Sequence, residues 1–337
     1  MLKFDDRIPV VVQTQRGDTP IENVRVDDVV YSFHSGESLR VVDILETQVS
    51  NIYRIRYTDG RSDYYQEHET ICLGKTLTNI SMLTTELLES GNFRTVISQP
   101  TIHYEVNVDH HMVPDPYIAG ALLIHGERDD EHINLPLDRP SANKFIVNKY
   151  RLKLGHKIGD NRIYFKYNDG MDKLITWNEF FPNGVQETIP LEYRRASMKD
   201  RWKFIQGVFD VGFDKYHFSE TIGVSNPSEW KLKEVQRMLW SLGVLSTVTY
   251  DSTLGKKREY RLDVRSGSFD YPGYFYDIDH ITYALEQKYK IQNALEPIEL
   301  KIQSMEQSRS RAYTKKLKLE QPCVPFLCDN FLPRVSG

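Results

Sequence analysis

Three segments of the chain alternate positively charged side chains with apolar ones. Successive side chains of a β-strand point to opposite faces, so residues 149–154, 162–167 and 257–265 would each gather cations on one face. One charged face is an ordinary solvated surface, but three together suggest a sheet that lies on a polyanion and contacts its phosphates. The candidate contact residues are Lys149, Arg151, Lys153, Arg162, Lys166, Lys257, Arg258 and Arg261.

The overall charge of the chain hides a local excess of cations. The 337 residues carry a net charge of −4, which by itself argues against a nucleic-acid partner. Between residues 139 and 203, however, fourteen Lys and Arg stand against seven Asp and Glu. A basic middle part within an acidic chain is the pattern expected of one face that binds a polyanion.

The cysteines and histidines indicate neither a disulfide framework nor a zinc site. The chain has three cysteines, an odd number without a CxxC pair, which points to a reducing compartment. The histidines between residues 103 and 132 follow no familiar zinc spacing. No nucleotide-binding loop or nucleophile elbow occurs. The most apolar stretch, residues 117–124, is far shorter than the roughly 20 residues that a bilayer requires, so we expect a cytoplasmic protein without a membrane anchor.

Helices are the first elements that must position these side chains. Asp115 is a good N-cap and Pro116 suits the first helical position, so an apolar and buried helix is predicted there. A second helix has Ser197 as its cap, with Asp200 reaching back. A third carries four apolar side chains on one face and stops at Gly243. The predicted helices cover residues 116–126, 197–213 and 229–242.

The two ends of the chain are predicted to consist of short strands. Thr58-Asp59-Gly60 follows an alternating strand and signals a hairpin. A proline-bearing linker at residues 109–116 separates this β-rich part from the first helix. A further helix is predicted near residues 280–292, and short strands follow it to the end. The β-rich runs of the first hundred residues are 10–12, 24–31 and 52–57.

Two of the predicted helices resemble the paired motifs of the LAGLIDADG homing endonucleases. Residues 118–126 match the nine-residue motif, and residues 205–213 match its second copy. Gly120 and Gly207 stand where two helices related by a pseudo-twofold axis would pack backbone against backbone, which a missing Cβ permits. The resemblance implies an αββαββα unit whose strands sit in the major groove of a long DNA site, with one chain acting as a pseudo-dimer.

The flanking segments resemble an intein, or Hint, domain that the endonuclease-like unit interrupts. Residues 10–33 resemble the opening Hint pattern, residues 64–73 the segment with the splicing histidine, and residues 325–337 the closing segment. The order of these motifs along the chain implies descent from a mobile intein or a free-standing homing endonuclease. Such an origin implies an intracellular, nucleoid-associated protein encoded by a phage or another mobile element.

The residues that perform splicing in that family are absent. No Cys, Ser or Thr occurs in residues 1–13, so no side chain can form the first ester. Val335 and Ser336 replace the family's His-Asn pair, which excludes cyclisation of an asparagine. His68 matches the splicing histidine, but Tyr65 stands in place of its usual Thr. We therefore interpret His68 as a structural relic.

The residues that cleave DNA in the LAGLIDADG family are also replaced. Those enzymes use one acid at the eighth position of each motif to hold Mg²⁺ against the scissile phosphates. The corresponding residues here are His125 and Gly212. If cleavage is retained, the resemblance implies Mg²⁺ held by displaced acids; otherwise these acids are solvated helix ends. The displaced acids are Glu127, Asp129, Asp130, Asp210 and Asp214.

Together these features predict an α+β protein of two domains. An all-β, horseshoe-shaped Hint-like domain is expected from residues 1–108 and 269–337, and a pseudo-twofold LAGLIDADG domain from residues 109–268. The favoured function is sequence-selective binding of double-stranded DNA by a monomer, with endonuclease activity weakened or lost and splicing lost. The alternative is a domesticated scaffold or protein-interaction module, and a third possibility is deliberate replacement of the splicing residues.

Overall fold

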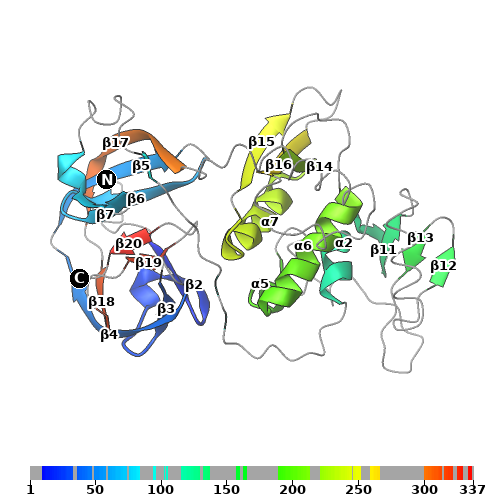
Figure 1. The fold of residues 1–337 in the computed structure, drawn as a ribbon, viewed down its shortest axis with the longest axis horizontal. Coiled ribbons are helices and arrows are strands. Elements are labelled where there is room, and N and C mark those ends of the chain that lie inside the picture. Colours follow the sequence, from blue (N-terminus) through cyan, green and yellow to red (C-terminus); the bar gives the residue numbers. More distant parts are fainter. Residues whose placement is uncertain are drawn as a thin grey trace, which may run out of the picture. The chain divides into compact units, whose positions relative to one another are not determined.

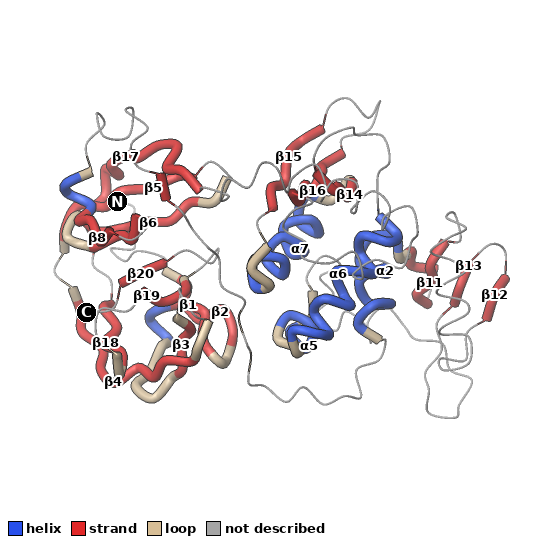
Figure 2. The backbone as a smooth tube through the Cα atoms, viewed as in Figure 1, coloured by secondary structure: helices blue, strands red, loops and turns tan. Residues whose placement is uncertain are grey.

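The computed structural model has a mixed α+β fold with several antiparallel sheets (Figures 1 and 2). It divides into unit 1, residues 1–105 with 296–337, and unit 2, residues 106–295. The boundaries predicted from the sequence followed residues 108 and 268. The structure describes residues 10–32, 36–47, 49–57, 60–73, 76–83, 94–95, 102, 104, 115–129, 132–136, 157–159, 162–164, 189–212, 221–244, 246–251, 259–265, 300–312, 315–321, 325–328 and 333–335.

Unit 1 is built from both ends of the chain. Its first sheet is antiparallel, with the strand order β18-β4-β3-β1-β2. Isolated bridges join Val12 to Cys328 and Ser32 to Phe326, so the two ends interleave in one core. The strands of this sheet are β1 (Val11–Thr14), β2 (Gly17–Pro20), β3 (Val29–Tyr31), β4 (Ser38–Glu46) and β18 (Lys315–Leu319).

A second sheet of unit 1 has the order β6-β5-β17-β9. The predicted hairpin is confirmed between β5 and β6, where Gly60 has φ +87° and its N–H donates to the Tyr57 carbonyl at 3.0 Å. The strands are β5 (Ser50–Tyr57), β6 (Ser62–Gln66), β9 (Arg94–Thr95) and β17 (Leu300–Ala312). Two strand pairs complete the unit: β7 (Thr70–Leu73) with β8 (Thr76–Asn79), and β19 (Pro325–Leu327) with β20 (Pro333–Val335).

Two strand predictions in unit 1 need correction. The run 24–31 is a strand only from Val29 onward, because Asp27 has φ +71° and the Asp28 carboxylate accepts the Arg25 N–H at 2.8 Å. This is a side-chain turn that competes with strand geometry. The C-terminal part contains one 13-residue strand, β17, rather than short runs only. Its polar sequence shows no apolar alternation, and two register shifts accompany its pairing with β5. The helix predicted near residues 280–292 lies outside the described residues.

The core of unit 1 contains a buried tyrosine pair. The hydroxyl oxygens of Tyr57 and Tyr65 lie 3.5 Å apart. Burial, followed by the influence of Tyr57 and Asp63, raises the pKa of Tyr65 well above its ordinary value of 10.0. The folded state therefore holds the phenol proton more tightly than the unfolded state does.

Tyr65 should consequently make stability fall at alkaline pH. Its contribution is fully present below pH 10.0 and is lost as pH rises above the unfolded pKa toward the raised folded one. At pH 7, the free energy of unfolding of Tyr65→Phe should lie within about 1 kcal/mol of that of the wild type. Between pH 10 and 11, the free energy of unfolding of the wild type should fall by up to about 1.4 kcal/mol more than that of the variant. Urea unfolding of both proteins at pH 10 and pH 11 measures this difference. An equal fall in the free energy of unfolding of the two proteins would contradict the prediction.

Unit 2 contains the three helices predicted from the sequence and two small antiparallel sheets. The sheet orders are β10-β11-β13-β12 and β14-β16-β15. None of the helices in the described part of the chain is long and apolar enough to cross a membrane. The helices are α2 (Pro116–His125), α5 (Leu191–Arg194), α6 (Met198–Gly212) and α7 (Glu229–Ser241). The strands are β10 (Glu127–Asp129), β11 (His132–Pro136), β12 (Lys157–Gly159), β13 (Arg162–Tyr164), β14 (Thr221–Asn226), β15 (Ser246–Asp251) and β16 (Glu259–Arg265).

The predicted starts of α2 and α6 are confirmed. The Asp115 carboxylate accepts the Tyr117 N–H at 2.9 Å, and Pro116 occupies the first turn of α2. All side chains of α2 before His125 are buried. At α6, the Ser197 hydroxyl accepts the Asp200 N–H at 3.2 Å and donates to the Asp200 carboxylate at 2.8 Å. Both helices therefore begin where local capping residues dictate.

The end of α7 is also set by a local signal. Gly243 has φ +79°, and its N–H donates to the Trp240 carbonyl at 3.0 Å. The Val244 N–H donates to the Leu239 carbonyl at 2.9 Å, which completes a Schellman motif. The predicted apolar face of α7 is buried, with Leu232, Val235, Leu239 and Leu242 in the core of unit 2.

Candidate nucleic-acid interface

Helices α2 and α6 pack with their backbones in direct contact, and they lie side by side in Figures 1 and 2. A Cβ added to Gly120 would lie 2.0 Å from the carbonyl oxygen of Phe204. A Cβ added to Gly207 would lie 1.8 Å from the carbonyl oxygen of Tyr117. No other residue type fits at either position without moving a helix. The backbone contact predicted for this glycine pair is confirmed.

The two glycine contacts are reciprocal. Each glycine faces the carbonyl of the residue three positions before the other glycine, namely Phe204 and Tyr117. Each also faces the backbone nitrogen of the residue that follows the other glycine. An added Cβ would lie 3.1 Å from the Val208 nitrogen at Gly120 and 3.0 Å from the Ala121 nitrogen at Gly207. Such equivalence is the pattern that a local twofold axis between two helices produces.

The carboxylate of Asp210 is engaged between the two helices. Asp210 is only 1% exposed, and its carboxylate accepts the Tyr117 hydroxyl at 2.8 Å. The two residues lie 93 positions apart in the chain, so this bond forms only through the packing of α2 against α6. In this arrangement Asp210 ties α6 to α2 and is not open to a metal ion.

The remaining ends of the two helices do not form an oxygen-rich metal site in the described residues. His125 ends α2, Glu127 is exposed at the start of β10, and Gly212 ends α6. No group of three metal-ligating side chains occurs within the part of the chain that the structure describes. Because Mg²⁺ prefers several carboxylate oxygens, His125, Gly212 and the engaged Asp210 do not fit it. The side chain of Asp129, and Asp130 and Asp214 entirely, lie outside the described residues.

Strand β16 separates its side chains as predicted. Leu262 and Val264 lie in the core of unit 2, whereas Arg261 and Asp263 alternate with them and so belong to the other face. Arg261 nevertheless is only 5% exposed. Its Nε donates to the Asp263 carboxylate at 2.5 Å, and its guanidinium covers Gly223, where an added Cβ would lie 2.5 Å from it. Arg261 is therefore packed and paired rather than offered to solvent.

The other sheet places a row of polar residues across its strands. The register sets Glu127, Asn134, Tyr164 and Lys157 directly beside one another on β10, β11, β13 and β12. Leu135 belongs to the core, so this row belongs to the opposite face of the sheet. Asn134 is fully buried, and neither amide atom has a hydrogen-bond partner among the described residues. Asn134 was not among the predicted site residues, because its only sequence signal is a polar residue between the apolar Ile133 and Leu135.

Solved inteins and a solved homing endonuclease match the structure. The homing endonuclease I-DmoI, in complex with DNA and Ca, matches with 17% identity over 51% of this chain and 96% of its own, at a TM-score of 0.31. The gp41-1 intein matches with 25% identity over 22% of this chain, at a TM-score of 0.21. The MchDnaB-1 intein matches with 18% identity over 27% of this chain and 67% of its own, at a TM-score of 0.23.

The match to the gp41-1 intein is partial from both sides, since this chain spans 57% of that intein's length. Other solved forms of I-DmoI are complexes with its target DNA in the presence of Mn or Mg. No family model and no curated protein matches the chain.

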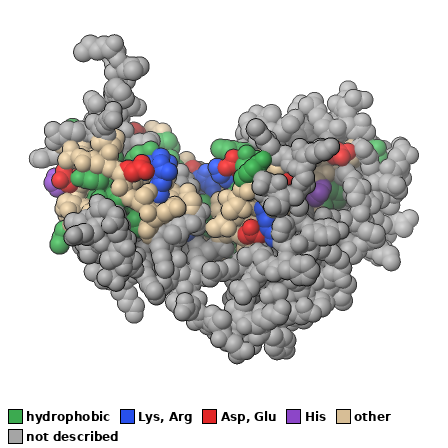
Figure 3. Space-filling view, turned by 90° about the horizontal axis from the view of Figure 1, so that it is seen from above, with side chains coloured by type: hydrophobic (Ala, Val, Ile, Leu, Met, Phe, Trp, Pro, Cys, Tyr) green, Lys and Arg blue, Asp and Glu red, His purple; other side chains and the backbone are tan. Residues whose placement is uncertain are grey.

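Most of the predicted phosphate contacts lie outside the described residues. Arg162 lies in β13, but its side chain is not among those described. On the face drawn in Figure 3, the described Lys and Arg side chains lie beside carboxylates. Two described lysines are held in ion pairs, Lys203 with Asp200 at 3.1 Å and Lys233 with Glu229 at 2.7 Å. The predicted contacts outside the described residues are Lys149, Arg151, Lys153, Lys166, Lys257 and Arg258.

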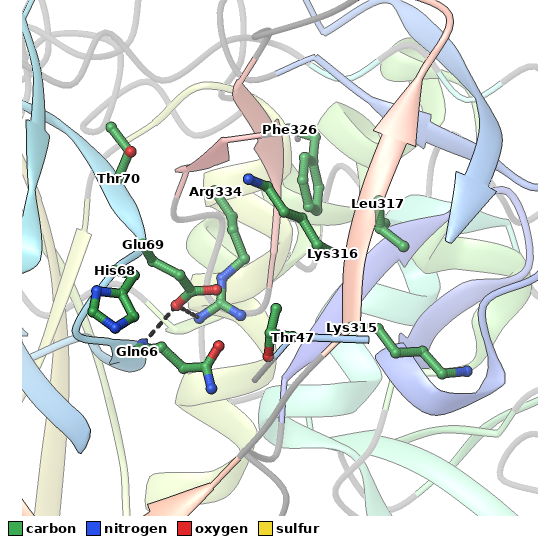
Figure 4. A pocket seen from close by; sticks show the side chains of 10 residues that line it. All are labelled: Thr47, Gln66, His68, Glu69, Thr70, Lys315, Lys316, Leu317, Phe326 and Arg334. Atoms are coloured by element: carbon green, nitrogen blue, oxygen red, sulfur yellow. Dashed lines mark hydrogen bonds and ion pairs between the residues drawn. The ribbon is translucent and has the colours of Figure 1, made fainter. Parts of the chain in front are cut away.

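His68, which the sequence analysis compared with a splicing histidine, is exposed in unit 1. His68 lies in the turn between β6 and β7 and lines a pocket (Figure 4). Tyr65 is fully buried, and the guanidinium carbon of Arg334 lies over its ring, 5.1 Å from the ring centre. Tyr65 thus packs in the core of unit 1.

Proposed function

We propose that the protein binds double-stranded DNA with sequence selectivity, as a monomer of homing-endonuclease and intein lineage. In this proposal unit 2 is an αββαββα LAGLIDADG unit inserted into a Hint-like unit 1. Cleavage is weakened or lost, and splicing is lost. The proposed contacts are Lys149, Arg151, Lys153, Arg162, Lys166, Lys257 and Arg258, whereas Arg261 supports the sheet through Asp263 and Gly223.

The reciprocal packing of Gly120 and Gly207 is the observation that carries this proposal. It relates α2 and α6 by a local twofold, and each helix precedes a small antiparallel sheet. A DNA duplex has its own local twofold axes, and β-ribbons fit its major groove. The two sheets that follow these helices suit two halves of one DNA site, and the cation excess in residues 139–203 supports contact with phosphates.

The loss of both chemistries rests on the residues that occupy the reacting positions. His125 and Gly212 supply no carboxylate for Mg²⁺, and Asp210 is buried against Tyr117. For splicing, residues 1–13 contain no nucleophile, and Val335 and Ser336 replace the His-Asn pair. If Mg²⁺ does act in this protein, Glu127, Asp129, Asp130 and Asp214 are the acids left to hold it.

A pull-down of sheared DNA in the presence of Mg²⁺ tests the proposal, with sequencing of the bound fragments and of their ends. Enrichment of one locus with intact ends is the expected result. Enrichment with new common ends would show that acids such as Glu127 and Asp214 still support cleavage. Absence of any enriched locus would overturn DNA binding and favour the scaffold alternative.

The salt dependence of DNA binding should identify the contact face. Lys149→Ala/Lys153→Ala should flatten the slope of log K against log salt by about 2, since each lost phosphate contact contributes about 0.9. The matched control, Lys203→Ala/Lys233→Ala, removes two cations that already pair with carboxylates and should leave the slope unchanged. Fluorescence anisotropy between 50 and about 300 mM salt measures both slopes. An equal change of this slope in the two variants, or an affinity that does not depend on salt, would refute the assigned contact face.

A further inference from the structure

Unit 1 contains a pocket of about 290 Å³ between the β6–β7 turn and strand β18 (Figure 4). Residues of the turn line one side, residues of β18 another, and Arg334 of β20 and Phe326 of β19 complete the wall. No metal cluster and no reacting pair of side chains occurs among its lining residues. The lining residues are Thr47, Gln66, His68, Glu69, Thr70, Lys315, Lys316, Leu317, Phe326 and Arg334.

Positive charge dominates this pocket. Lys315, Lys316 and Arg334 stand against one carboxylate, that of Glu69, and the exposed His68 adds a further basic group. Lys315 turns away, because its Nζ donates to the Glu22 carbonyl at 2.7 Å (Figure 4). The lining cations that remain for a ligand are therefore Lys316 and Arg334.

Arg334 is fixed through one nitrogen of its guanidinium, and its other two nitrogens have N–H groups without a partner among the described residues. Its Nη2 lies 3.4 Å from the Glu69 carboxylate and also donates to the Tyr64 carbonyl. Nε and Nη1 are buried and have no hydrogen-bond partner among the described residues. Burial alone would lower the pKa of Arg334, but the charges of Glu69 and Asp63 outweigh it and raise that pKa above its ordinary value. The guanidinium is thus a permanent, buried cation with two unused N–H directions.

A buried donor without a partner costs free energy unless a ligand or water satisfies it. An oxyanion would satisfy such donors and would also offset the positive charge of Lys316. The hydroxyls of Thr47 and Thr70 line the same pocket and are suited to a group with several acceptor oxygens. Phosphate has this chemistry, and a pocket of about 290 Å³ holds it with room for a small ester substituent.

We propose that this pocket binds phosphate, either as a free anion or small ester or as a phosphate of nucleic acid. Arg334 forms its floor and Lys316 its charged rim. The site belongs to unit 1 and does not depend on the DNA interface proposed for unit 2, so either proposal can fail without the other.

Titration of the full chain with inorganic phosphate, followed by calorimetry and by ³¹P line broadening at constant ionic strength, tests the proposal. Lys316→Met should weaken phosphate binding about tenfold, whereas Lys316→Arg should retain it. Lys318→Met is the matched control: this residue lies on the same strand, pairs with Asp43 at 3.1 Å and does not line the pocket. It should change the affinity less than twofold.

Several outcomes decide the proposal and the source of the phosphate. Phosphate bound no better than chloride by the wild-type protein, or an equal loss in Lys316→Met and Lys318→Met, would overturn it. The ³¹P measurement on the wild type decides this even if a variant fails to fold. A duplex oligonucleotide that displaces bound phosphate in a Lys316-dependent manner would identify nucleic acid as the source, and phosphate that remains bound would identify a small anion.

Discussion

Gly207→Ala is expected to cost unit 2 about 3 kcal/mol or more in its free energy of unfolding. The new Cβ would lie 1.8 Å from the carbonyl oxygen of Tyr117, and a backbone atom cannot move aside as a side chain can. The helices must therefore separate, which opens the core around α2, whose side chains before His125 are all buried. Gly120→Ala should cost a similar amount, since its Cβ would lie 2.0 Å from the Phe204 carbonyl. Urea unfolding followed by circular dichroism measures both.

The double variant of Gly120 and Gly207 separates this mechanism from general helix destabilisation. Once one Cβ has pushed the helices apart, the second meets less resistance, so the double variant should cost clearly less than the sum of the single ones. Gly60→Ala is a control for glycine loss without a clash, because no atom lies within 4 Å of its added Cβ. Its φ of +87° should make it cost about 1–2 kcal/mol. Strictly additive costs for Gly120 and Gly207 would argue against the shared contact.

Arg201→Met should destabilise unit 2 by about 3 kcal/mol, because a fully buried cation and its hydrogen bonds are lost together. Arg201 is 0% exposed and lies in the first turns of α6. Its Nε donates to the Ala196 carbonyl at 3.1 Å, and its Nη1 donates to the carbonyl and hydroxyl oxygens of Ser241 at 2.9 and 2.6 Å. It therefore anchors the last turn of α7, where a cation also complements the helix dipole.

Lys203→Met provides the matched control for Arg201. Lys203 lies on the same helix and pairs with Asp200 at 3.1 Å, but this ion pair is partly solvated and should contribute less than about 1 kcal/mol. Arg201→Lys should not restore the stability, because a single ammonium lacks the planar guanidinium fork that bonds to Ala196 and Ser241 at the same time. Thermal unfolding of the four proteins gives the comparison. A cost for Arg201→Met no larger than for Lys203→Met would show that the buried guanidinium is dispensable.

Sequence reasoning predicted the elements whose signals are local. Asp115 with Pro116 marked the start of α2, Ser197 marked the start of α6, and Gly243 marked the end of α7. These residues act on the backbone within one turn, so the chain reveals them without knowledge of the fold. The strand β17 could not be predicted in the same way. Its polar residues carry no period of their own, and the pairing with β5 is what defines it.

The residues of the candidate site also differ in how far the sequence alone predicts their contacts. The types and spacing of Gly120 and Gly207 by themselves determined where two helices could meet, because only glycine allows backbones to touch. By contrast, three contacts depend on how the chain packs: Asp210 bonds to Tyr117, Arg261 lies over Gly223, and Arg334 lines a pocket with Lys316. The physical reason is that a side chain's burial and partners depend on residues distant in the chain. Charge can be read along a sequence, but its availability to a ligand is settled by what packs around it.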